Sequence, residues 1–468
     1  MSEKTPTVLR GVSTWRWMLR YLRDPLECLT EVQRRYGALT AIGSPLPFHT
    51  GGRRFVLALG ERYNRQVLGQ PDLFRPGGQV LVGPRNSAQF RMRRGIFAMR
   101  GPMHRAHRRL MQPPFLKPAV AGYGDTMLRL IDSVIDRWQP GEPLDIYREM
   151  RTLSNWVAAY ILFGNSDFAA SIQIGKEIEQ WLALDSEARR GFLWIDLPGT
   201  TYRRLLRQAE RLEKLMVGAI ERCRRVEPPG TDALTILIRA FEAGEPGMTP
   251  NVLIAHAAIL YAASFETTAN VLAWTLFLIA QHPSIAVKLQ EEIASLPSWP
   301  PDMQVLDDLP VLDGAVRESL RLLPPVAYTF RTPTVATDLD GIPVHPGDKV
   351  IISSFLSHRD PEVFPEPNRF HPARWQSARP SPYEYLPFSA GPRLCLGHTF
   401  ALLELKLTVA RIMQRFRLNV VPGSTIDAIV QLTLRPRQGI PMTVHKQDGS
   451  FAAGSISGNI HRMVDLRS

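Results

Sequence analysis

Apolar residues recur at three- and four-residue spacing over most of this chain of 468 residues, a pattern typical of amphipathic helices. Leu26, Leu29 and Val32 share one face directly after Asp24-Pro25, a pair that favours a helix start. Helices therefore dominate the expected structure. The same spacing predicts them within 125–245 and over 251–281, 285–296, 311–321 and 398–417.

Strand patterns are short and few. They predict strands over 38–41 and 54–58 with a turn at Gly51-Gly52 between them, a hairpin over 344–353, and further strands over 432–436 and 441–445. Three segments lack a clear period: residues 1–20, which start irregular, residues 74–100, which predict a long loop, and residues 449–468, whose low apolar content predicts a disordered tail.

Composition predicts a large buried core, because 44% of the residues are hydrophobic. The three cysteines, Cys28, Cys223 and Cys395, lie far apart and are odd in number, which argues against a disulfide framework and for a reducing compartment. The apolar run 252–280 contains polar residues such as His256, so it reads as a core helix and not as a membrane span. With no signal sequence at the N-terminus, we expect a soluble, cytoplasmic protein without a transmembrane segment.

The net charge of +12 would suit nucleic acid, anionic lipid or an acidic protein partner. The arginines are spread among apolar residues along the chain, and no zinc-ligand spacing, RNA-binding aromatic signature or isolated basic tail is present. Nucleic acid is therefore the weaker reading, and no nucleic-acid partner is expected.

The segment 388–397, Phe-Ser-Ala-Gly-Pro-Arg-Leu-Cys-Leu-Gly, places Cys395 in a glycine-rich loop directly before the predicted helix 398–417. Unpaired backbone N–H groups at a helix start stabilise a thiolate, which is the form of cysteine that binds metal. Gly391 and Gly397 leave room for a flat group near the backbone. A buried structural cysteine is the alternative explanation.

Phe388, Gly391, Arg393, Cys395 and Gly397 match every fixed position of one known signature, and the segment resembles the haem-ligand loop of the cytochrome P450 superfamily. The resemblance implies haem b bound through the Cys395 thiolate, with Arg393 paired to a haem propionate. It covers roughly residues 24–446 and resembles the soluble bacterial type. It implies a mainly α fold with a small β portion, formed by a single haem domain over 1–448.

The helix predicted over 251–281 contains Ala263-Ser-Phe-Glu266-Thr267-Thr, an acid and a hydroxyl in apolar surroundings. A buried carboxylate without partners is costly, so such an exception usually marks function. A threonine that bonds its own i−4 carbonyl is the structural alternative. The motif resembles the family's oxygen-activation groove, in which Thr267 would hydrogen-bond activated oxygen and Glu266 would relay protons. Ser264 stands where the family usually has glycine, which would narrow this groove.

Further haem contacts are implied by position. His104 and Arg108 lie four residues apart, so they share one helix face, and that segment resembles the family's propionate-binding helix. A solvated cationic face is the alternative. Arg331 stands where family members place another propionate partner.

Glu318 and Arg321 can pair at i, i+3, and the resemblance completes them with Arg369 as a buried structural triad that supports the Cys395 loop.

The pocket for an apolar substrate is expected to involve Ala263, Val326 and Leu432. The segment 189–201 exposes an apolar tip at a Leu-Pro-Gly-Thr turn and resembles the lid loop of relatives that act on bulky lipophilic molecules.

The resemblance implies a monomeric monooxygenase that inserts one atom of O2 into an apolar small molecule by hydroxylation or epoxidation. Electrons would come from NAD(P)H through a ferredoxin or flavodoxin and its reductase, because the chain shows no flavin- or iron–sulfur-binding module of its own. The expected docking face exposes Arg105, Arg109, Lys406 and Arg411. A peroxide-driven peroxygenase or decarboxylase, and a non-catalytic haem-based sensor, are the alternatives.

Overall fold

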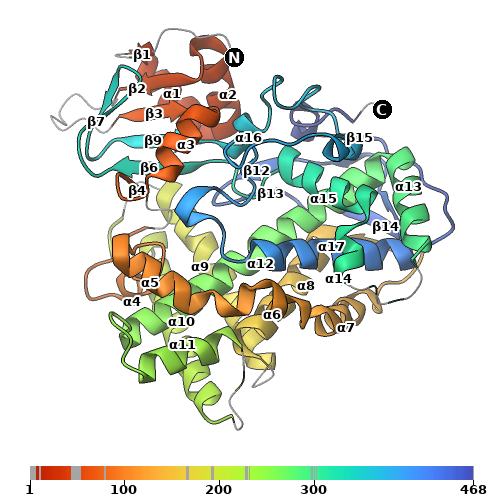
Figure 1. Ribbon diagram of the computed structural model, residues 1–468, viewed down its shortest axis with the longest axis horizontal. Coiled ribbons are helices and arrows are strands. Elements are labelled where there is room, and N and C mark those ends of the chain that lie inside the picture. The colour runs from red at the N-terminus through yellow and green to blue at the C-terminus, as the bar shows by residue number, and fades with distance from the viewer. Residues whose placement is uncertain are drawn as a thin grey trace.

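Helices make up most of the computed structural model, which describes residues 7–9, 12–43, 54–77, 81–164, 168–190, 194–226, 230, 232–296, 299, 301 and 303–466. The longest helix, α12 (Pro250–Gln281), runs through the middle of the molecule with α8 (Ile146–Phe163) and α17 (His398–Arg415) packed against it (Figure 1). The other helices are α1 (Val12–Arg23), α2 (Pro25–Tyr36), α3 (Glu61–Gly69), α4 (Ala88–Met92), α5 (Gly101–Met111), α6 (Lys117–Ala121), α7 (Gly124–Ile135), α9 (Phe168–Arg190), α10 (Thr201–Arg224), α11 (Ala233–Glu242), α13 (Pro283–Ala294), α14 (Met303–Asp307), α15 (Pro310–Leu322) and α16 (Ser354–Ser357).

Helix starts follow the local sequence. The Asp24 side chain accepts a hydrogen bond from the backbone N–H of Glu27 at 3.1 Å, and Pro25 occupies the first turn of α2. Thr249 caps α12 in the same way, with Pro250 behind it. Such caps satisfy backbone N–H groups that have no partner inside the helix. The predicted start of α2 is therefore confirmed.

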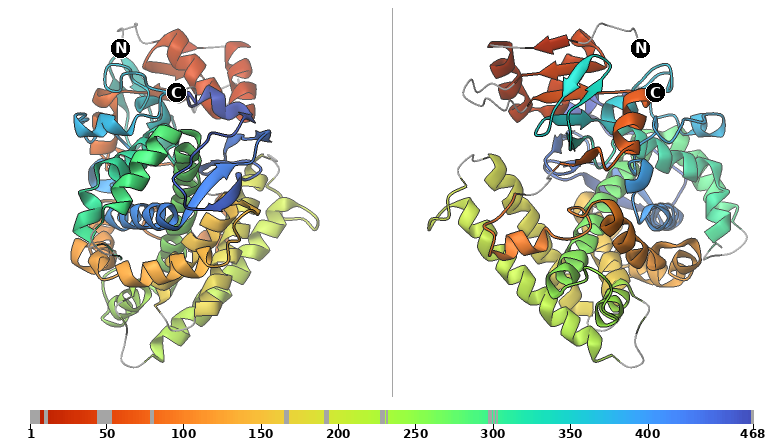
Figure 2. Two further views of the ribbon diagram at one scale, coloured as in Figure 1. Left: turned by 90° about the vertical axis from the view of Figure 1, so that its right-hand side faces the viewer. Right: turned by 60° about the vertical axis from the view of Figure 1, so that its left-hand side comes forward.

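The largest sheet lies at one end of the molecule beside the amino-terminal helices, and α9 and α10 lie side by side at the opposite end (Figure 2). It is mixed, with strand order β1-β2-β3-β9-β6-β4. The strands predicted over 38–41 and 54–58 are β2 and β3, and they pair antiparallel; Gly51-Gly52 lies outside the described residues. The six strands are β1 (Thr7–Leu9), β2 (Leu39–Ile42), β3 (Phe55–Ala58), β4 (Phe74–Pro76), β6 (Thr329–Pro333) and β9 (Lys349–Ile352).

The hairpin predicted over 344–353 is wrong. The chain turns earlier, at Asp340 and Gly341, where both residues adopt positive φ angles, and it continues past β8 into the large sheet as β9. The smaller sheets are β10 (Phe416–Val420) with β14 (Pro441–Lys446) and β5 (Pro143–Asp145), β7 (Thr337–Leu339) with β8 (Ile342–Val344), β11 (Ser424–Thr425) with β15 (Ile456–Ser457), and β12 (Ala428–Val430) with β13 (Leu434–Pro436).

The core is organised around α12. Its carboxyl-terminal half buries Trp274 in a cluster with α15 and α17, and its amino-terminal half buries Tyr261 and Phe265 in a second cluster with α8 to α11. By length and composition alone α12 could cross a membrane, but 67% of its apolar window is buried inside the protein. The prediction that this run forms a core helix is confirmed.

The tail predicted to be disordered is instead folded as far as residue 466, so that prediction is wrong. β15 pairs with β11, Ile460 and Val464 are buried, and Arg359 donates to the Met463 carbonyl at 2.7 Å. The segment has few apolar residues, but these are buried against the rest of the protein. A low apolar content alone therefore did not indicate disorder here. The expected long loop over 74–100 also contains β4 and α4, and α1 begins at Val12, within the stretch expected to start irregular.

Candidate functional site

The segment 388–397 ends at the amino terminus of α17, and its last residue, Gly397, is the N-cap residue of that helix. The Cys395 backbone N–H donates to the Phe388 carbonyl at 2.9 Å, which closes the loop on itself. Cys395 is accessible, yet protein atoms surround it so densely that burial is the largest influence on its pKa, which it raises. The Gly397 backbone N–H and the positive charge of Arg108 oppose that increase. Cys395 is therefore open to an approaching group, and two neighbours partly offset the effect of burial on its thiolate form.

Glycine is required at one end of this loop. Gly391 has a φ of 70°, and a Cβ atom there would lie 2.6 Å from the Leu68 carbonyl oxygen of α3, so no other residue fits. A Cβ on Gly397 would meet only the Phe115 ring, at 3.7 Å. The protein itself therefore leaves space beside Gly397, as the approach of a flat group to the loop requires.

Four basic residues from three parts of the chain gather near Cys395, and we call them the cation cluster: His104 and Arg108 of α5, Arg331 of β6, and Arg393 of the loop. Burial lowers the pKa of each, and for His104 and Arg331 the charge of Arg393 lowers it further. The pKa of His104 falls to about 4 and that of Arg331 to about 10. His104 is therefore neutral near pH 7, whereas the three arginines remain charged.

No carboxylate of the described residues forms an ion pair with the three arginines of the cation cluster. Arg331 donates to Thr329 Oγ1 and the Phe330 carbonyl, and Arg393 donates to the Met99 carbonyl while its Nε has no partner. The acidic residue whose charge reaches Arg393 is Asp72, which is 69% exposed. Buried cations are costly without an anion. The cluster thus fits a group that carries two carboxylates, as haem does.

Glu266 lies on α12 and is half-buried, and burial raises the pKa of its carboxyl group. Its Oε1 accepts a hydrogen bond of 2.8 Å from Thr433 Oγ1. That hydrogen bond and the positive charges of Arg151 and Arg435 oppose the effect of burial. The carboxylate therefore has one direct donor and two cations near it, and sequence spacing had identified none of these three residues.

The serine and threonine hydroxyl groups next to Glu266 in the sequence donate hydrogen bonds to backbone carbonyls of α12 itself. Thr267 Oγ1 donates to the Ala263 carbonyl at 2.8 Å, and Thr268 Oγ1 donates to the Ser264 carbonyl at 2.9 Å. This i−4 bond of Thr267 is the structural alternative named above, and it leaves the oxygen free to accept a hydrogen bond. The Ser264 hydroxyl donates its proton to the Tyr261 carbonyl of the same helix, so this proton is directed at the backbone of α12.

Glu318 is the centre of a second buried group of charges. Its Oε1 accepts from Arg321 at 2.8 Å and from Arg374 Nε at 2.9 Å, and its Oε2 accepts from Arg321 Nε at 2.9 Å and from Trp375 Nε1 at 3.0 Å. The side chains of Glu318 and Arg321 are fully buried. We call these four residues the Glu318 network. Every charge in it has a hydrogen-bonding partner of opposite sign.

The prediction that Arg369 completes this group is wrong. Arg369 lies on the surface and pairs with Glu366 at 3.0 Å, and only its backbone carbonyl contacts Arg321. Arg374, five residues later, takes the expected place from a 3₁₀ turn, Pro372–Gln376. This turn packs so tightly on α15 that a Cβ on Gly314 would lie 2.5 Å from the Pro372 carbonyl. The close packing directs Arg374 inward.

His358 connects the Glu318 network to the Cys395 loop, a role that no sequence motif signalled. Its Nδ1 lies 3.0 Å from the Arg321 carbonyl, and its Nε2 accepts from the Leu386 backbone N–H at 2.7 Å. Nδ1 therefore carries the proton and the ring is neutral. Burial lowers the pKa of His358 to about 3. Leu386 stands two residues before Phe388, so the contact fixes the start of the loop.

The expected substrate residues lie on segments that meet. Ala263 is exposed, Val326 and Leu432 are half-buried, and Leu432 packs against the second core cluster. The Leu434 backbone N–H donates to the Pro325 carbonyl at 2.9 Å, which joins the two segments that carry Val326 and Leu432.

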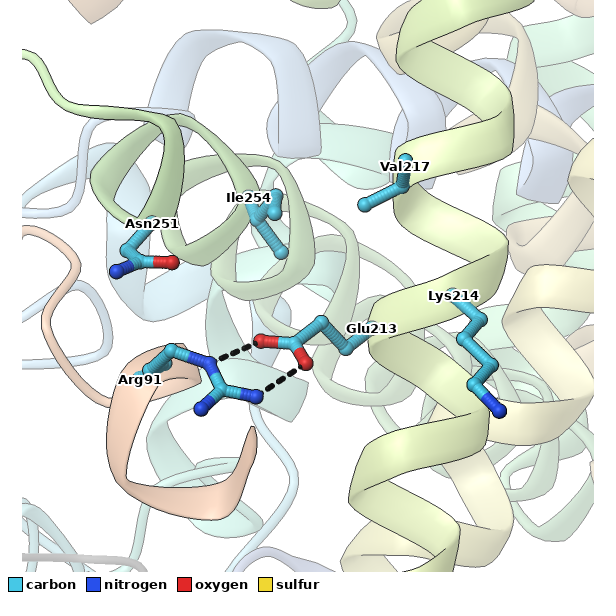
Figure 3. Close-up of a pocket in the computed structure, with 6 residues that line it drawn as sticks. All are labelled: Arg91, Glu213, Lys214, Val217, Asn251 and Ile254. Atoms are coloured by element: carbon cyan, nitrogen blue, oxygen red, sulfur yellow. Dashed lines mark hydrogen bonds and ion pairs between the residues drawn. The ribbon is translucent and has the colours of Figure 1, made fainter. Parts of the chain in front are cut away.

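A separate surface hollow of about 360 Å³ lies between α4, α10 and the start of α12 (Figure 3). Arg91 and Glu213 line it and satisfy each other through two hydrogen bonds of 2.7 and 2.6 Å. The remaining lining residues are Lys214, Val217, Asn251 and Ile254. It shares no residue with the site around Cys395.

Two of the four cations expected on the docking face are not available there. Lys406 is 4% exposed and pairs with Asp307 and Asp313, and Arg411 pairs with Asp132. These expectations are wrong, because aspartates of neighbouring elements pair with both side chains. Arg105 and Arg109 of α5 are exposed.

A cysteine at a helix start, three arginines without a carboxylate partner among the described residues and an acid–hydroxyl pair are the features that a haem-thiolate protein requires. The comparisons with known proteins agree: the Cytochrome P450 family profile matches residues 14–443, and the chain belongs to this family. It is a cytochrome P450 monooxygenase with haem as its cofactor, and the predicted fold class is confirmed.

Relatives and a solved structure place the chain more closely. It is 32% identical over 414 residues, 86% of this chain and 87% of the relative, to cyclooctat-9-en-7-ol 5-monooxygenase of Streptomyces melanosporofaciens. It is 30% identical over 444 residues, 91% of this chain and 99% of the relative, to a putative cytochrome P450 139 of Mycobacterium tuberculosis. The fold matches a retinoic acid-bound cyanobacterial CYP120A1 with a TM-score of 0.77 at 23% identity, over 92% of this chain and 96% of that chain.

Proposed function

We propose that this monooxygenase inserts one atom of O2 into an apolar small molecule at a haem held by Cys395. The observation that carries the proposal is the cation cluster beside a loop cysteine. Its arginines have no carboxylate partner among the described residues, and the pKa of the Cys395 thiol is raised by burial, while the Gly397 N–H and Arg108 oppose that increase. When bound, a thiolate-ligated haem supplies the activation of O2.

Arg331 and Arg393 hold the haem propionates in this proposal, and Arg108 adds positive charge between them and Cys395. Charge-assisted hydrogen bonds to two carboxylates would relieve the mutual repulsion that lowers the pKa of these arginines. His104 is neutral at physiological pH, so it acts as a hydrogen-bond donor to the same carboxylates and not as a fourth cation. Phe388, Gly391 and Gly397 shape the loop around this group.

Thr267 and Glu266 supply protons to the oxygen. Thr267 Oγ1 can accept a hydrogen bond while its own proton rests on the Ala263 carbonyl, and it can return that proton toward the site. Glu266 has a raised pKa, which brings its proton exchange closer to neutral pH, as a relay requires. The acid–hydroxyl pair favours use of O2 over the peroxide-driven alternative.

We infer an apolar substrate pocket bounded by Ala263, Val326 and Leu432. A relative with 32% identity is named for the oxidation of cyclooctat-9-en-7-ol, a mostly hydrocarbon molecule, which supports an apolar substrate of comparable character. Electrons come from NAD(P)H through an acidic ferredoxin or flavodoxin and its reductase, and Arg105 and Arg109 are the exposed cations that remain as docking residues.

The test is the spectrum of the reduced carbonyl complex. Wild-type protein should show the red-shifted Soret band of thiolate ligation, and Cys395→Ala should lose it. Cys28→Ala and Cys223→Ala are matched controls, because both residues are buried and away from the loop. Persistence of the band in Cys395→Ala would refute the ligand. Substrate-dependent NAD(P)H consumption with an added redox chain then separates a monooxygenase from a haem-based sensor.

A further inference from the structure

Glu266 has an unusual partner. Among the described residues, the only hydrogen bond to its carboxylate comes from Thr433 Oγ1, at 2.8 Å, from a position 167 residues later in the chain. Thr433 is 4% exposed and lies in the turn between β12 and β13. A hydroxyl buried at that point has one evident use, which is to bind this carboxylate.

The turn that carries Thr433 is fixed from several directions. The Gln431 backbone N–H donates to the Thr433 carbonyl at 3.1 Å, and the next residue, Leu434, donates its N–H to the Pro325 carbonyl. The Leu434 carbonyl accepts from Trp274 Nε1 of α12 at 3.3 Å. Thr433 therefore cannot follow Glu266 if the carboxylate moves, and it defines one orientation of Oε1 while Oε2 stays free of a donor.

Charged groups reach Glu266 from three neighbouring elements. Arg151 of α8 and Arg435 of β13 favour its anionic form, and Glu179 of α9 opposes it. Tyr147 of α8 is close enough for the charge of Glu266 to raise its pKa. Arg151 and Glu179 pair with each other, and their side chains are 28% and 46% exposed. This partly exposed pair is therefore near enough to Glu266 for both of its charges to influence the carboxylate.

We propose that Thr433 is a positioning residue for proton delivery: its hydroxyl holds Oε1 of Glu266 so that Oε2 exchanges protons between the Arg151–Glu179 side and Thr267. The inference rests on the proposed function of Glu266 as a relay. Loss of the Thr433 hydroxyl removes the one hydrogen bond of a buried carboxylate and frees its rotation, without removing either relay residue.

Two substitutions test this role. Thr433→Val keeps the shape of the side chain and removes the hydroxyl, and Thr433→Ser restores it. The pKa of Glu266 is read from its carboxyl infrared band during pH titration of the substrate-free ferric protein, with Glu266→Gln to assign the band. We expect Thr433→Val to raise this pKa by roughly 1 to 2 units, the equivalent of a hydrogen bond to a charged group. Thr433→Ser should lie close to wild type.

The functional counterpart is the yield of product per NAD(P)H. Thr433→Val should lower this yield and kcat several-fold while the spectral Kd for substrate stays within about two-fold, and Thr433→Ser should recover both. Thr425→Val, which removes an exposed hydroxyl on β11, is the matched control and should change neither quantity. An unshifted pKa of Glu266 in Thr433→Val, or a Ser variant that behaves like Val, overturns the proposal. Absence of the thiolate carbonyl spectrum in wild type would instead refute the proposed function and leave the pKa result standing.

Discussion

Two groups of buried charges connect to the Cys395 loop, and they differ in how those charges are satisfied. In the Glu318 network every charged atom group meets an opposite charge or a hydrogen-bonding partner within the protein. In the cation cluster three arginines and His104 lie near one another without a carboxylate partner among the described residues. Both groups are rich in arginine, but the sequence analysis named all four members of the cation cluster and only Glu318 and Arg321 of the Glu318 network.

The difference shows what each group is for. A complete network stabilises the folded protein by itself, because removal of one partner leaves a buried charge uncompensated. An incomplete cluster of like charges destabilises the protein alone and becomes favourable only when an anion binds. The comparison therefore supports, on electrostatic grounds, the proposal that the Glu318 network supports the Cys395 loop and the cation cluster holds the cofactor.

The largest expected effect comes from breaking the Glu318 network. Arg374→Leu should lower the free energy of unfolding by about 3 to 5 kcal/mol, because it leaves Glu318 short of a buried partner. Arg369→Leu is the matched control and should change it by less than about 1 kcal/mol, since its ion pair with Glu366 is exposed at the surface. Urea unfolding monitored by circular dichroism measures both. Equal effects of the two substitutions would contradict the assignment of Arg374 to the network.

This pair of arginines also shows how far the sequence could predict the site. The Cys395 loop and the Glu318–Arg321 pair were predictable because their residues are neighbours in the chain or one helical turn apart. The choice between Arg369 and Arg374 depends on a positive φ angle at Glu366 and on the close approach of Pro372 to Gly314. No periodicity encodes either of these features.

The other contacts that the sequence analysis did not predict also join residues that lie far apart in the chain. His358 acts through backbone atoms of two distant segments, and Thr433 reaches Glu266 across 167 residues of chain. The folded tail depends on a few apolar residues, such as Ile460, that find places in a core built by other segments. Local patterns identify helices and contiguous motifs, whereas these contacts exist only after the chain has folded.

The pH dependence of stability tests the same comparison, with a smaller expected change in the free energy of unfolding than that of Arg374→Leu. His104 has a folded pKa of about 4 and His358 one of about 3, both below the ordinary 6.5. The unfolded chain therefore binds more protons than the folded one below pH 6.5, and each histidine removes stability as the pH falls from about 6.5 toward its folded pKa. By pH 4.5 each loss reaches roughly 3 kcal/mol in the haem-free protein.

Bound haem should change the folded pKa of His104 and leave that of His358 unchanged. Carboxylates next to His104 would raise its folded pKa and reduce its share of the acid destabilisation, whereas His358 contacts the backbone of Arg321 and Leu386 and keeps its share. Unfolding measured from pH 7 to pH 4.5 should thus show that His104→Gln flattens the pH dependence in the haem-free protein more than in the haem-bound protein. His358→Gln, the comparison variant, should flatten it equally in both forms. A His104 contribution that haem leaves unchanged would argue against the cation cluster as the carboxylate site.

The smallest effect concerns the surface near the cation cluster, where Arg109 is exposed and Lys406 is buried in ion pairs with Asp307 and Asp313. Exposed charges act on the association of proteins more than on bound-state energy, and at about 0.15 M salt their reach is roughly 8 Å. Arg109→Glu should therefore slow first-electron transfer from an acidic ferredoxin by a few-fold at low salt, and this difference should shrink as salt is added.

Lys406→Met should leave the rate unchanged and instead lower the free energy of unfolding by about 1 to 2 kcal/mol, because two carboxylates lose their cation. Stopped-flow reduction under carbon monoxide at several ionic strengths measures the rates. If Lys406→Met slowed reduction and Arg109→Glu did not, the docking surface would lie on α17 and the separation of exposed from paired cations would fail as a guide to partner binding.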